Sequence, residues 1–580
     1  MKKLFLIGML FTCVLISAQN KFSVYMKNGS IVNYITSEVD SIVFAKDTQT
    51  PPEDSTTVEP EIGSIQITRS EGWFESGFVE WTPVKDAIGY QVYYKTSSED
   101  DSKYQKLDDM LIRNYGSYIR ADLLGLIPNS YSVKISPIYT NEKSGEASIA
   151  KITTVAHNRE GFAHHNNPNG VGAYNNDGSL KENAIVLYVT EKSKKNLSLS
   201  VQTSATGFSD CTGISAILKA LQKGYETRPI CIRLIGKITI DGINESGDTN
   251  NLLIKASSAD RPVQNITIEG VGNDAVCYGF GIRCNRAKSI EIRNLAVMLF
   301  GDDGIALETD NVNIWIHNND FFYGSAGSDA DQVKGDGSMD LKNDSKYISI
   351  SYNHFWDSEK MSLCGMKSES AENWITYHHN WFDHSDSRHP RIRTMSVHIY
   401  NNYYDGVAKY GVGVTYGACA FVENNYFRNC PYPMLISMQG SDIANGNTGT
   451  FSSENGGIIK AFNNYMEGEK SYITFQQDNT LFDAYEASNR SEQVPTSIKC
   501  IKGETGYNNF DTNSSLMYSC SPDPTNNVPK IVMESAGRMN GGDFTWTFDN
   551  SKDDYDYEVN TELMTAITTY KSLLINILGE

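Results

Sequence analysis

Three arginines stand within the six residues 388–393, directly after a strand-like segment rich in aromatic residues. Upstream of them, Asp336 and Asp340 form an acidic pair, and Lys360 lies between the two groups. Carboxylates can bind a hard cation, and guanidinium and ammonium groups can bind the carboxylates of a polyanion. This combination predicts a site that binds an acidic polymer with the help of a metal ion.

The acidic pair has the ligand chemistry of calcium. On a fully extended strand, Asp336 and Asp340 would lie about 13 Å apart, too far to share an ion, but Gly337 permits a bend. Asp302 and Asp303 would lie one coil earlier in the repeat described below, about 4.8 Å beneath them. Ligation by oxygen alone suits calcium, which takes about 6–8 oxygens. The alternative is that these aspartates only form turns beside glycines.

The elements that must position these residues form a repeat. Short alternating apolar strands are each followed by a turn rich in Asn and aromatic residues, and the compact spacings between turns are 22 to 27 residues. Such a period predicts the coils of a parallel β-helix. Asn tolerates left-handed backbone angles, and stacked Asn side chains can hydrogen-bond from coil to coil. The repeating positions are Asn319, Asn353, Asn380, Asn402, Asn425 and Asn464.

Several shorter segments precede the repeat. Residues 1–18 have two lysines, an apolar run and a small-residue end, which is typical of a secretory signal peptide. Alternating runs predict a short N-terminal β module at 19–46, and a stretch rich in Thr, Pro and acidic residues predicts a linker at 47–62. Residues 63–156 predict a β-sandwich, and residues 157–580 the β-helix domain.

The sandwich carries one further pattern. Leu126, Pro128 and Tyr131 have the spacing of a tyrosine corner, so this domain resembles a fibronectin type III domain. We expect it to be a spacer and not a sugar-binding module. In the next domain, we expect a packing helix after a Thr212 cap and an apolar helical stripe near the C-terminus.

The composition limits the classes of partner. The chain has 70 acidic and 50 basic residues, for a formal net charge of −20, which argues against nucleic acid and anionic membranes. A polyanionic substrate must therefore be attracted locally. Ten cysteines, one of them in the signal segment, leave an odd number, so at least one is unpaired within the chain. Cys277 and Cys284 are close enough in sequence to be considered as a disulfide pair.

Ordered motifs run through the repeat, and they include Asp336 to Lys342, Leu363 with Gly365, His378 to Asn380, and Arg388 with Pro390 and Arg393. Together they resemble the pectate lyases of the first polysaccharide lyase family over roughly residues 165–470. The resemblance implies an all-β fold, in which a right-handed parallel β-helix follows the small β-sandwich.

The resemblance also implies roles for individual residues. It assigns catalysis to Arg388, substrate binding to Lys360 and Arg393, and calcium ligation to Asp303, Asp336 and Asp340. Asp302 is the second choice for the first ligand, because two adjacent aspartates stand where the family has Asp-x-Asp.

The implied activity is that of a secreted, calcium-dependent pectate lyase. Such an enzyme cleaves α-1,4-galacturonan by β-elimination and leaves 4,5-unsaturated oligogalacturonates. Calcium would acidify the C5 proton of the uronate, which Arg388 would remove. Because arginine is normally a weak base, neighbouring cations must favour its neutral form, and we expect activity to rise toward alkaline pH. The expected partner is polygalacturonate, with no nucleic acid and no membrane span, and the protein is expected to be a monomer.

Other interpretations stay open at this point. A β-helical polygalacturonase would hydrolyse its substrate with paired carboxylates and leave no new double bond. A catalytically inactive pectin-binding or adhesion protein would bind without cleavage, and a pectin lyase would prefer methylated substrate and ignore a chelator. Clustered histidines, such as His378, His379 and His389, also permit a zinc or general-base hypothesis, although we expect the first two to stack within the coil.

Overall fold

The computed structural model describes residues 21–25, 31–35, 64–140, 143–244, 250–327, 333–370, 372–444 and 451–580. The chain divides into two compact units, Met1–Glu61 and Ile62–Glu580. In the first unit, β1 (Lys21–Tyr25) pairs antiparallel with β2 (Ile31–Ile35). The predicted signal peptide and the whole of the predicted linker lie outside the described residues.

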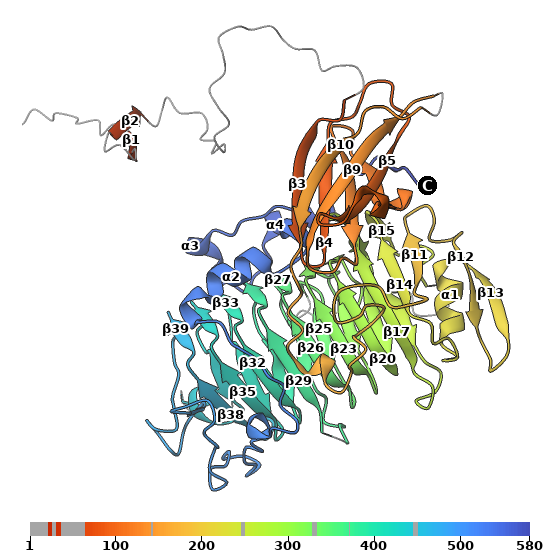
Figure 1. The fold of residues 1–580 in the computed structure, drawn as a ribbon. Helices are drawn as coiled ribbons and strands as arrows, with labels where there is room; N and C mark the ends of the chain where they lie inside the picture. Colours follow the sequence, from red (N-terminus) through yellow and green to blue (C-terminus); the bar gives the residue numbers. More distant parts are fainter. Residues whose placement is uncertain are drawn as a thin grey trace, which may run out of the picture. The chain divides into compact units, whose positions relative to one another are not determined.

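Two antiparallel sheets form a sandwich at the start of the second unit (Figure 1). Trp81 is fully buried between them, and the Tyr131 hydroxyl donates a hydrogen bond of 2.7 Å to the Ile127 carbonyl, as a tyrosine corner requires. One sheet contains β10 (Ser148–Thr153), β9 (Ser130–Ile138), β5 (Gly89–Thr96) and β6 (Gln105–Lys106). The other contains β3 (Ile67–Trp73), β4 (Ser76–Trp81), β8 (Ile119–Leu124), β7 (Ile112–Asn114) and β41 (Asn576–Ile577).

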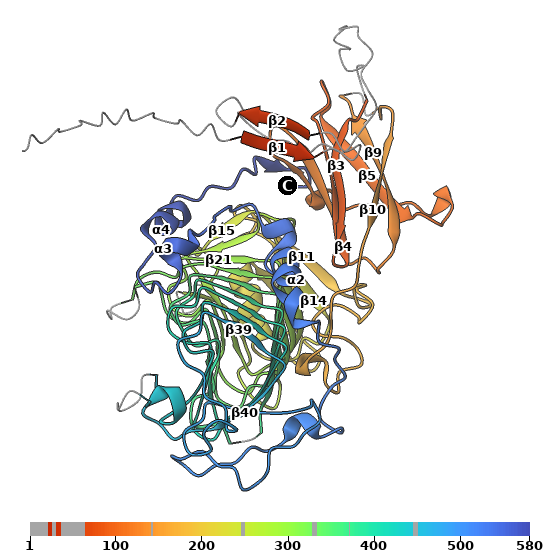
Figure 2. The same ribbon diagram turned by 90° about the vertical axis from the view of Figure 1, so that its left-hand side faces the viewer.

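The rest of this unit contains the predicted parallel β-helix, whose coils Figure 2 shows nearly end-on. The first sheet contains β11 (Ile185–Val189), β14 (Ile230–Leu234), β17 (Val263–Gly270), β20 (Ala287–Arg293), β23 (Val312–His317), β26 (Lys346–Ser351), β29 (Trp374–His378), β32 (Ser396–Tyr400), β35 (Cys419–Glu423), β38 (Ile458–Phe462) and β40 (Tyr485–Glu486).

The second and third parallel sheets complete each coil. The second contains β15 (Lys237–Thr239), β18 (Val276–Tyr278), β21 (Ala296–Met298), β24 (Asp320–Phe321), β27 (His354–Trp356), β30 (Trp381–Asp383), β33 (Tyr403–Asp405), β36 (Tyr426–Arg428) and β39 (Tyr465–Glu467). The third contains β16 (Asn251–Lys255), β19 (Gly281–Asn285), β22 (Ile305–Leu307), β25 (Met339–Leu341), β28 (Leu363–Cys364), β31 (Arg391–Arg393), β34 (Val412–Thr415) and β37 (Met434–Ile436).

The predicted Asn stack joins the first sheet to the second. Each ladder amide donates to the side-chain oxygen of the next, from Asn319 to Asn353 at 3.0 Å and onward through every coil to Asn464. The residue before each ladder Asn has a left-handed backbone, such as Asn318 with φ 53° and Asn401 with φ 51°. The Asn pattern therefore marks the turn of each coil, as the sequence predicted.

Helices and the C-terminal segment cover the coils. The predicted packing helix is α1 (Ile214–Leu221), but Gly213 and not Thr212 is its N-cap. It buries Ile214, Ile217, Leu218 and Leu221. Helix α2 (Val528–Ser535) and helix α4 (Thr561–Thr568) pack on the second sheet, with the short α3 (Asn550–Asp553) between them. The predicted C-terminal stripe is only partly helical, because the chain leaves the helix after Thr568 and adds β41 to the sandwich. The hairpin β12 (Ser198–Gln202) and β13 (Phe208–Thr212) lies beside α1.

All nine described cysteines are free thiols. Cys277 and Cys284, which the sequence suggested as a possible pair, are each fully buried on different strands, β18 and β19. The core itself is a continuous column of aliphatic and aromatic side chains inside the coils, so apolar packing and not disulfides holds the described part of the chain together.

Candidate functional site

The site lies on the third sheet, where strand alternation decides which side chains face outward. Inward-facing residues of successive coils stack in register and are fully buried, and they are Leu341, Cys364, Ile392 and Val414. Side chains alternate between the two faces of a strand. Asp340, Arg391 and Arg393, which are neighbours of these core residues, therefore belong to the outer face.

Three successive coils bring Asp336, Lys360 and Arg388 together just before this sheet. The Lys360 ammonium lies 4.0 Å from the Asp336 carboxylate, and the backbone of Lys360 forms a parallel bridge with Ser387. The Ser362 amide donates to the Arg388 carbonyl at 2.9 Å. Residues that are far apart in sequence thus meet because one coil lies directly on the next.

A buried lysine ties these three loops together. The Lys334 ammonium lies 2.6 Å from Asp357 and 2.8 Å from Asp386, and its side chain is 0% exposed. These three residues precede Asp336, Lys360 and Arg388, respectively, by two or three positions. Burial raises the pKa of Asp386 to about 8, although Lys334 opposes the shift. Lys334 therefore acts as an internal countercharge beneath the site.

Arg388 is the least engaged of the three arginines. Its backbone is left-handed, with φ 64°, a conformation that is uncommon for a side chain of this size. Among the residues that the structure describes, none forms a hydrogen bond or ion pair with its guanidinium. Burial raises the pKa of Asp340, and the charge of Arg388 opposes this rise; burial lowers the pKa of Arg391, and Arg388 adds to that lowering.

The neighbouring carboxylates can hold a hard cation. Asp302, Asp303 and Asp336 each offer an oxygen, and these atoms lie within 4.8 Å of one another. Asp340 lies beside this group, and its carboxylate folds back over Gly337, where an added Cβ would collide with it. An all-carboxylate donor set fits calcium, whose ligand oxygens lie roughly 2.3–2.6 Å from the ion. Both candidates for the first ligand, Asp302 and Asp303, belong to the group.

Basic side chains already offset part of this negative charge. The Lys342 ammonium lies 2.8 Å from Asp303 and 3.7 Å from Asp340, and Arg283 bonds to Asp302. Burial raises the pKa of Asp303 to about 8, with a further rise from Asp340 that Lys342 opposes. The pKa of Asp340 is also raised, chiefly by burial. Crowded, buried carboxylates of this kind favour any added cation.

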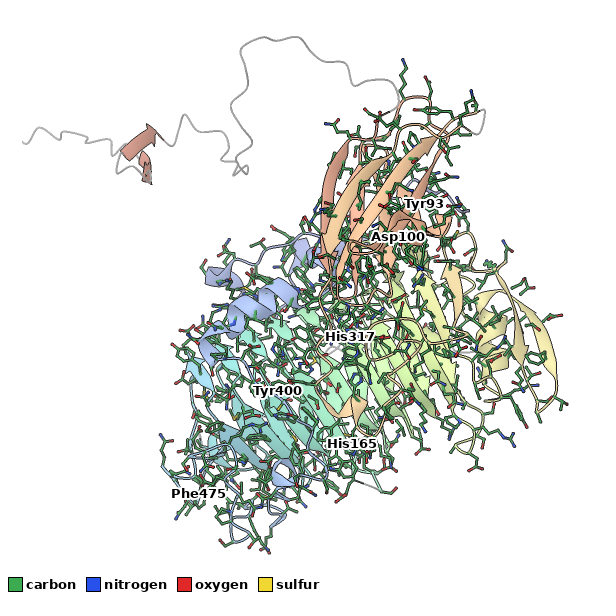
Figure 3. The ribbon with its side chains drawn as sticks, in the orientation of Figure 1. Tyr93, Asp100, His165, His317, Tyr400 and Phe475 are labelled. Atoms are coloured by element: carbon green, nitrogen blue, oxygen red, sulfur yellow. The ribbon has the colours of Figure 1, made fainter. Side chains whose placement is uncertain are left out.

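Histidines take a structural role in the described coils. His378 stacks on Tyr400 with ring centroids 4.9 Å apart, and His379 stacks on Tyr352 at 4.6 Å. Figure 3 labels Tyr400 and His317, which lie on β32 and β23 of the first sheet. His389 is fully buried and donates to the Tyr410 carbonyl at 2.8 Å, and burial lowers its pKa to about 3. His378 and His379 stack within the coils, as predicted. Their stacking argues against a role for either residue as a zinc ligand or a general base.

A second group of possible metal ligands, His398, Glu423 and Cys520, was missed from the sequence. Its members are already partnered, because His398 lies 2.8 Å from Glu423 and Arg490 lies 2.8 Å from the same carboxylate. Their chain positions are too far apart for any sequence spacing to have indicated them.

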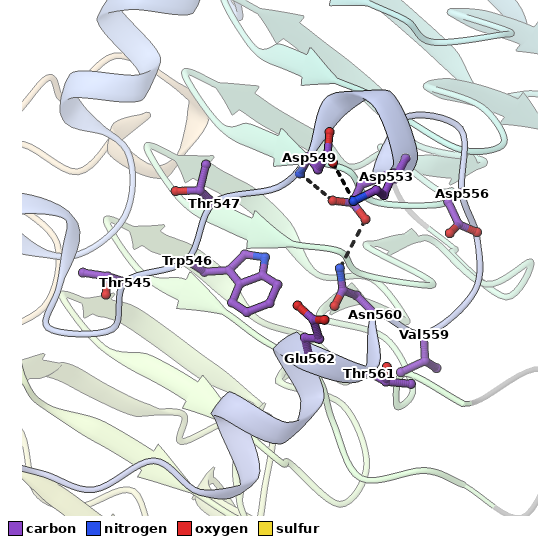
Figure 4. Close-up of a pocket in the computed structure, with 11 residues that line it drawn as sticks. Thr545, Trp546, Thr547, Asp549, Asp553, Asp556, Val559, Asn560, Thr561 and Glu562 are labelled. Atoms are coloured by element: carbon purple, nitrogen blue, oxygen red, sulfur yellow. Dashed lines mark hydrogen bonds and ion pairs between the residues drawn. The ribbon is translucent and has the colours of Figure 1, made fainter. Parts of the chain in front are cut away.

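A separate cavity of about 670 Å³ lies in the C-terminal segment (Figure 4). Its wall includes Trp546, Asn560 and Glu562, whose side chains converge in the close-up. None of the predicted site residues lines it. The candidate catalytic and metal-binding residues therefore lie at the outer face of the third sheet and not in this cavity.

Sequence reasoning also missed three charged residues at the site. Lys342 could have been found, because it stands two positions after Asp340 and must share its face of the strand. Lys334 and Glu454 gave no such signal. Glu454 contacts Arg393 from a connection that lies 61 positions further along the chain.

Comparisons with known proteins show what the chain is similar to. The sequence pattern of the family described as pectate lyase matches residues 148–539. The chain is similar to a pectate trisaccharide-lyase of Bacillus licheniformis, with 36% identity over 224 residues, or 38% of this chain and 62% of that protein. It is also similar to pectate lyase 3 of Pectobacterium carotovorum, with 30% identity over 250 residues, or 40% of this chain and 64% of that protein. These matches span less than two thirds of either relative.

Two solved structures are also similar. One is a pectate lyase from a Bacillus species in complex with trigalacturonate, with a TM-score of 0.45, 23% identity, and coverage of 66% of this chain and 99% of that chain. The other is pectate lyase II of Xanthomonas campestris, with a TM-score of 0.43, 22% identity, and coverage of 66% of this chain and 98% of that chain.

Proposed function

Because the chain belongs to the pectate lyase family, we propose that it is a secreted, calcium-dependent pectate lyase. It would cleave α-1,4-galacturonan by β-elimination and release 4,5-unsaturated oligogalacturonates. The observation that supports this most directly is the guanidinium of Arg388, which has no hydrogen-bond or ion-pair partner among the described residues and acts electrostatically on Asp340. The names of the similar curated proteins also point to pectate as the substrate.

Each residue has a defined task in this proposal. Arg388, as a neutral guanidine, accepts the proton from C5 of the uronate. The C–H electron pair forms the C4–C5 double bond, the C4–O bond breaks, and the leaving oxygen takes a proton. Lys360 binds a uronate carboxylate nearby, at the edge of the acidic group. Lys334 holds the three loops in place from beneath.

The calcium site would use Asp303, Asp336 and Asp340, with Asp302 beside them as the alternative first ligand. Bound calcium supplies Lewis acidity to the uronate carboxylate, which makes the C5 proton easier to remove. When a cation binds, Lys342 and Arg283 would lose some of the contacts that they now make with Asp303 and Asp302.

The cellular setting is part of the proposal. The signal-like residues 1–18 support export, and the net charge of −20 favours a soluble monomer without nucleic acid partners. In the described part of the chain, no helix has the length and apolar character needed to cross a membrane.

The function is tested on polygalacturonate at alkaline pH, with added calcium and with a chelator. We expect ultraviolet absorbance from the unsaturated product to rise with calcium and to stop with the chelator. New reducing ends without that absorbance would indicate a hydrolase. Binding without cleavage would indicate an inactive pectin-binding or adhesion protein, and activity on methylated pectin that resists the chelator would indicate a pectin lyase.

A further inference from the structure

Arg393, which was predicted to bind substrate, is bound to a carboxylate of the protein itself. Its Nε donates to Oε2 of Glu454 at 2.8 Å, and a terminal nitrogen donates to Oε1 at 3.4 Å. This two-point contact is the geometry in which arginine recognises carboxylates in general. The Glu454 carboxylate thus occupies the position on Arg393 that a substrate carboxylate would take.

Three more groups bind the same carboxylate. The Lys367 ammonium lies 2.5 Å from Oε1, the Thr415 hydroxyl donates to Oε2 at 3.0 Å, and Arg391 lies 3.5 Å from Oε2. Burial alone would raise the pKa of Glu454, but Arg393 and Lys367 bring it down to about 2. Glu454 is therefore ionised at any pH at which the protein would work.

The backbone around Glu454 is also fixed. The Ser437 hydroxyl donates to the Glu454 carbonyl at 2.8 Å, and the next carbonyl, of Asn455, accepts from the Tyr416 amide at 2.6 Å. The Ser452 hydroxyl accepts from Arg391 at 3.2 Å. With its side chain only 15% exposed, Glu454 is held from several sides, which argues against its displacement by substrate.

We propose that Glu454 sets the substrate specificity of the enzyme, by occupying the guanidinium of Arg393 so that the sugar bound there is accepted with a methyl-esterified carboxyl group. This inference rests on the proposed function. A second carboxylate placed beside Glu454 would be repelled, whereas an uncharged methyl ester would not. The favoured substrate class is therefore partly methyl-esterified galacturonan. Cleavage would occur where a free uronate lies beside the acidic group and a methyl-esterified uronate lies beside Glu454.

The test compares kcat/KM on polygalacturonate and on partly methyl-esterified pectin. Glu454→Gln keeps the side-chain shape and removes the charge. We expect it to shift the ratio toward polygalacturonate by about tenfold, mainly through KM, the size of effect that one charge-assisted hydrogen bond can give. Thr415→Val is the matched control, because it removes one contact to the same carboxylate and leaves its charge, so the ratio should stay constant.

An unchanged ratio, or an equal loss on both substrates, would overturn the proposal, because Glu454 would then only position Arg393. Binding of the two polymers to Arg388→Ala protein, with and without Glu454→Gln, makes the same comparison without turnover. A shift in binding, together with no lyase product from the protein that retains Arg388, would refute the proposed function and keep the inference. Lyase activity with no shift in binding would keep the function and refute the inference.

Discussion

Replacing Lys334 by methionine should destabilise the β-helix strongly and in a pH-dependent way. The Lys334 side chain is 0% exposed, and its partners Asp357 and Asp386 are 5% and 1% exposed, so water cannot replace the lost countercharge. Removing one partner of a buried ion pair costs about 3–5 kcal/mol. Because Asp357 loses this cation and Asp386 keeps only the more distant Lys409, at 3.7 Å, we expect Lys334→Met to fall within this range, at about 4 kcal/mol.

The pH dependence follows from the two carboxylates. Burial raises the pKa of Asp357 to about 6 and that of Asp386 to about 8, both above their unfolded values. The folded state therefore favours their protonated forms, and loss of Lys334 matters most once they ionise. The deficit of Lys334→Met should be small at pH 5 and should grow as pH rises through about 6 and 8, so that it is clearly larger at pH 9.

Urea unfolding of wild type and Lys334→Met at pH 5 and pH 9 measures this. Adding Asp386→Asn to the variant should restore part of the stability at pH 9, because one unpaired carboxylate is removed. Lys106→Met removes a surface ion pair of comparable length with Asp109, at 2.9 Å, and should change little. A deficit below about 1 kcal/mol, or one that is equal at both pH values, would refute the reasoning.

Three further predictions concern other parts of the molecule. Burial alone would lower the pKa of His384, but hydrogen bonds to two aspartates raise it to about 10. The stabilisation from protonated His384 should be complete below about pH 6.5 and lost as pH rises through 10. His384→Gln should therefore reduce the difference in melting temperature between pH 6 and pH 10, and an unaltered difference would contradict this. Asn402→Ala removes a fully buried ladder amide that donates to Asn425 at 3.0 Å, and urea unfolding should show a loss of about 1–3 kcal/mol, whereas an unchanged midpoint would argue against the ladder. Gly337→Ala places a Cβ against the Asp340 carboxylate and should weaken calcium binding in calorimetric titration; equal affinity would remove Gly337 from the account.

Much of the fold was predictable because it is periodic. The ladder from Asn319 to Asn464 recurs at nearly every coil, so the turns could be located without any tertiary information. The position of β41 could not be predicted, because Asn576–Ile577 pairs with β7 across most of the length of the chain. Thr212 was wrong as a cap, because the chain turns into α1 at Gly213, whose φ of 85° suits glycine.

The site was predictable where its residues are carried by motifs. Arg388, Lys360 and the aspartates of residues 336–340 occur in ordered blocks, and stacking of the coils brings them together. Glu454 and Lys334 were missed because their roles depend on which loops meet in space, which spacing along the chain does not report. Arg393 was predicted to bind substrate, but its contact with Glu454 became visible only with the fold.

The central claim is that Arg388 removes the C5 proton of a calcium-bound galacturonan. The most direct measurement is the rate of unsaturated product formation from polygalacturonate, with calcium at alkaline pH, for wild type and Arg388→Ala. Arg69→Ala in the sandwich, where the arginine is 41% exposed, controls for loss of an arginine elsewhere. The account predicts a loss of about 100- to 10,000-fold for Arg388→Ala, the usual contribution of a general base, with unchanged calcium binding. Activity within a fewfold of wild type would contradict it.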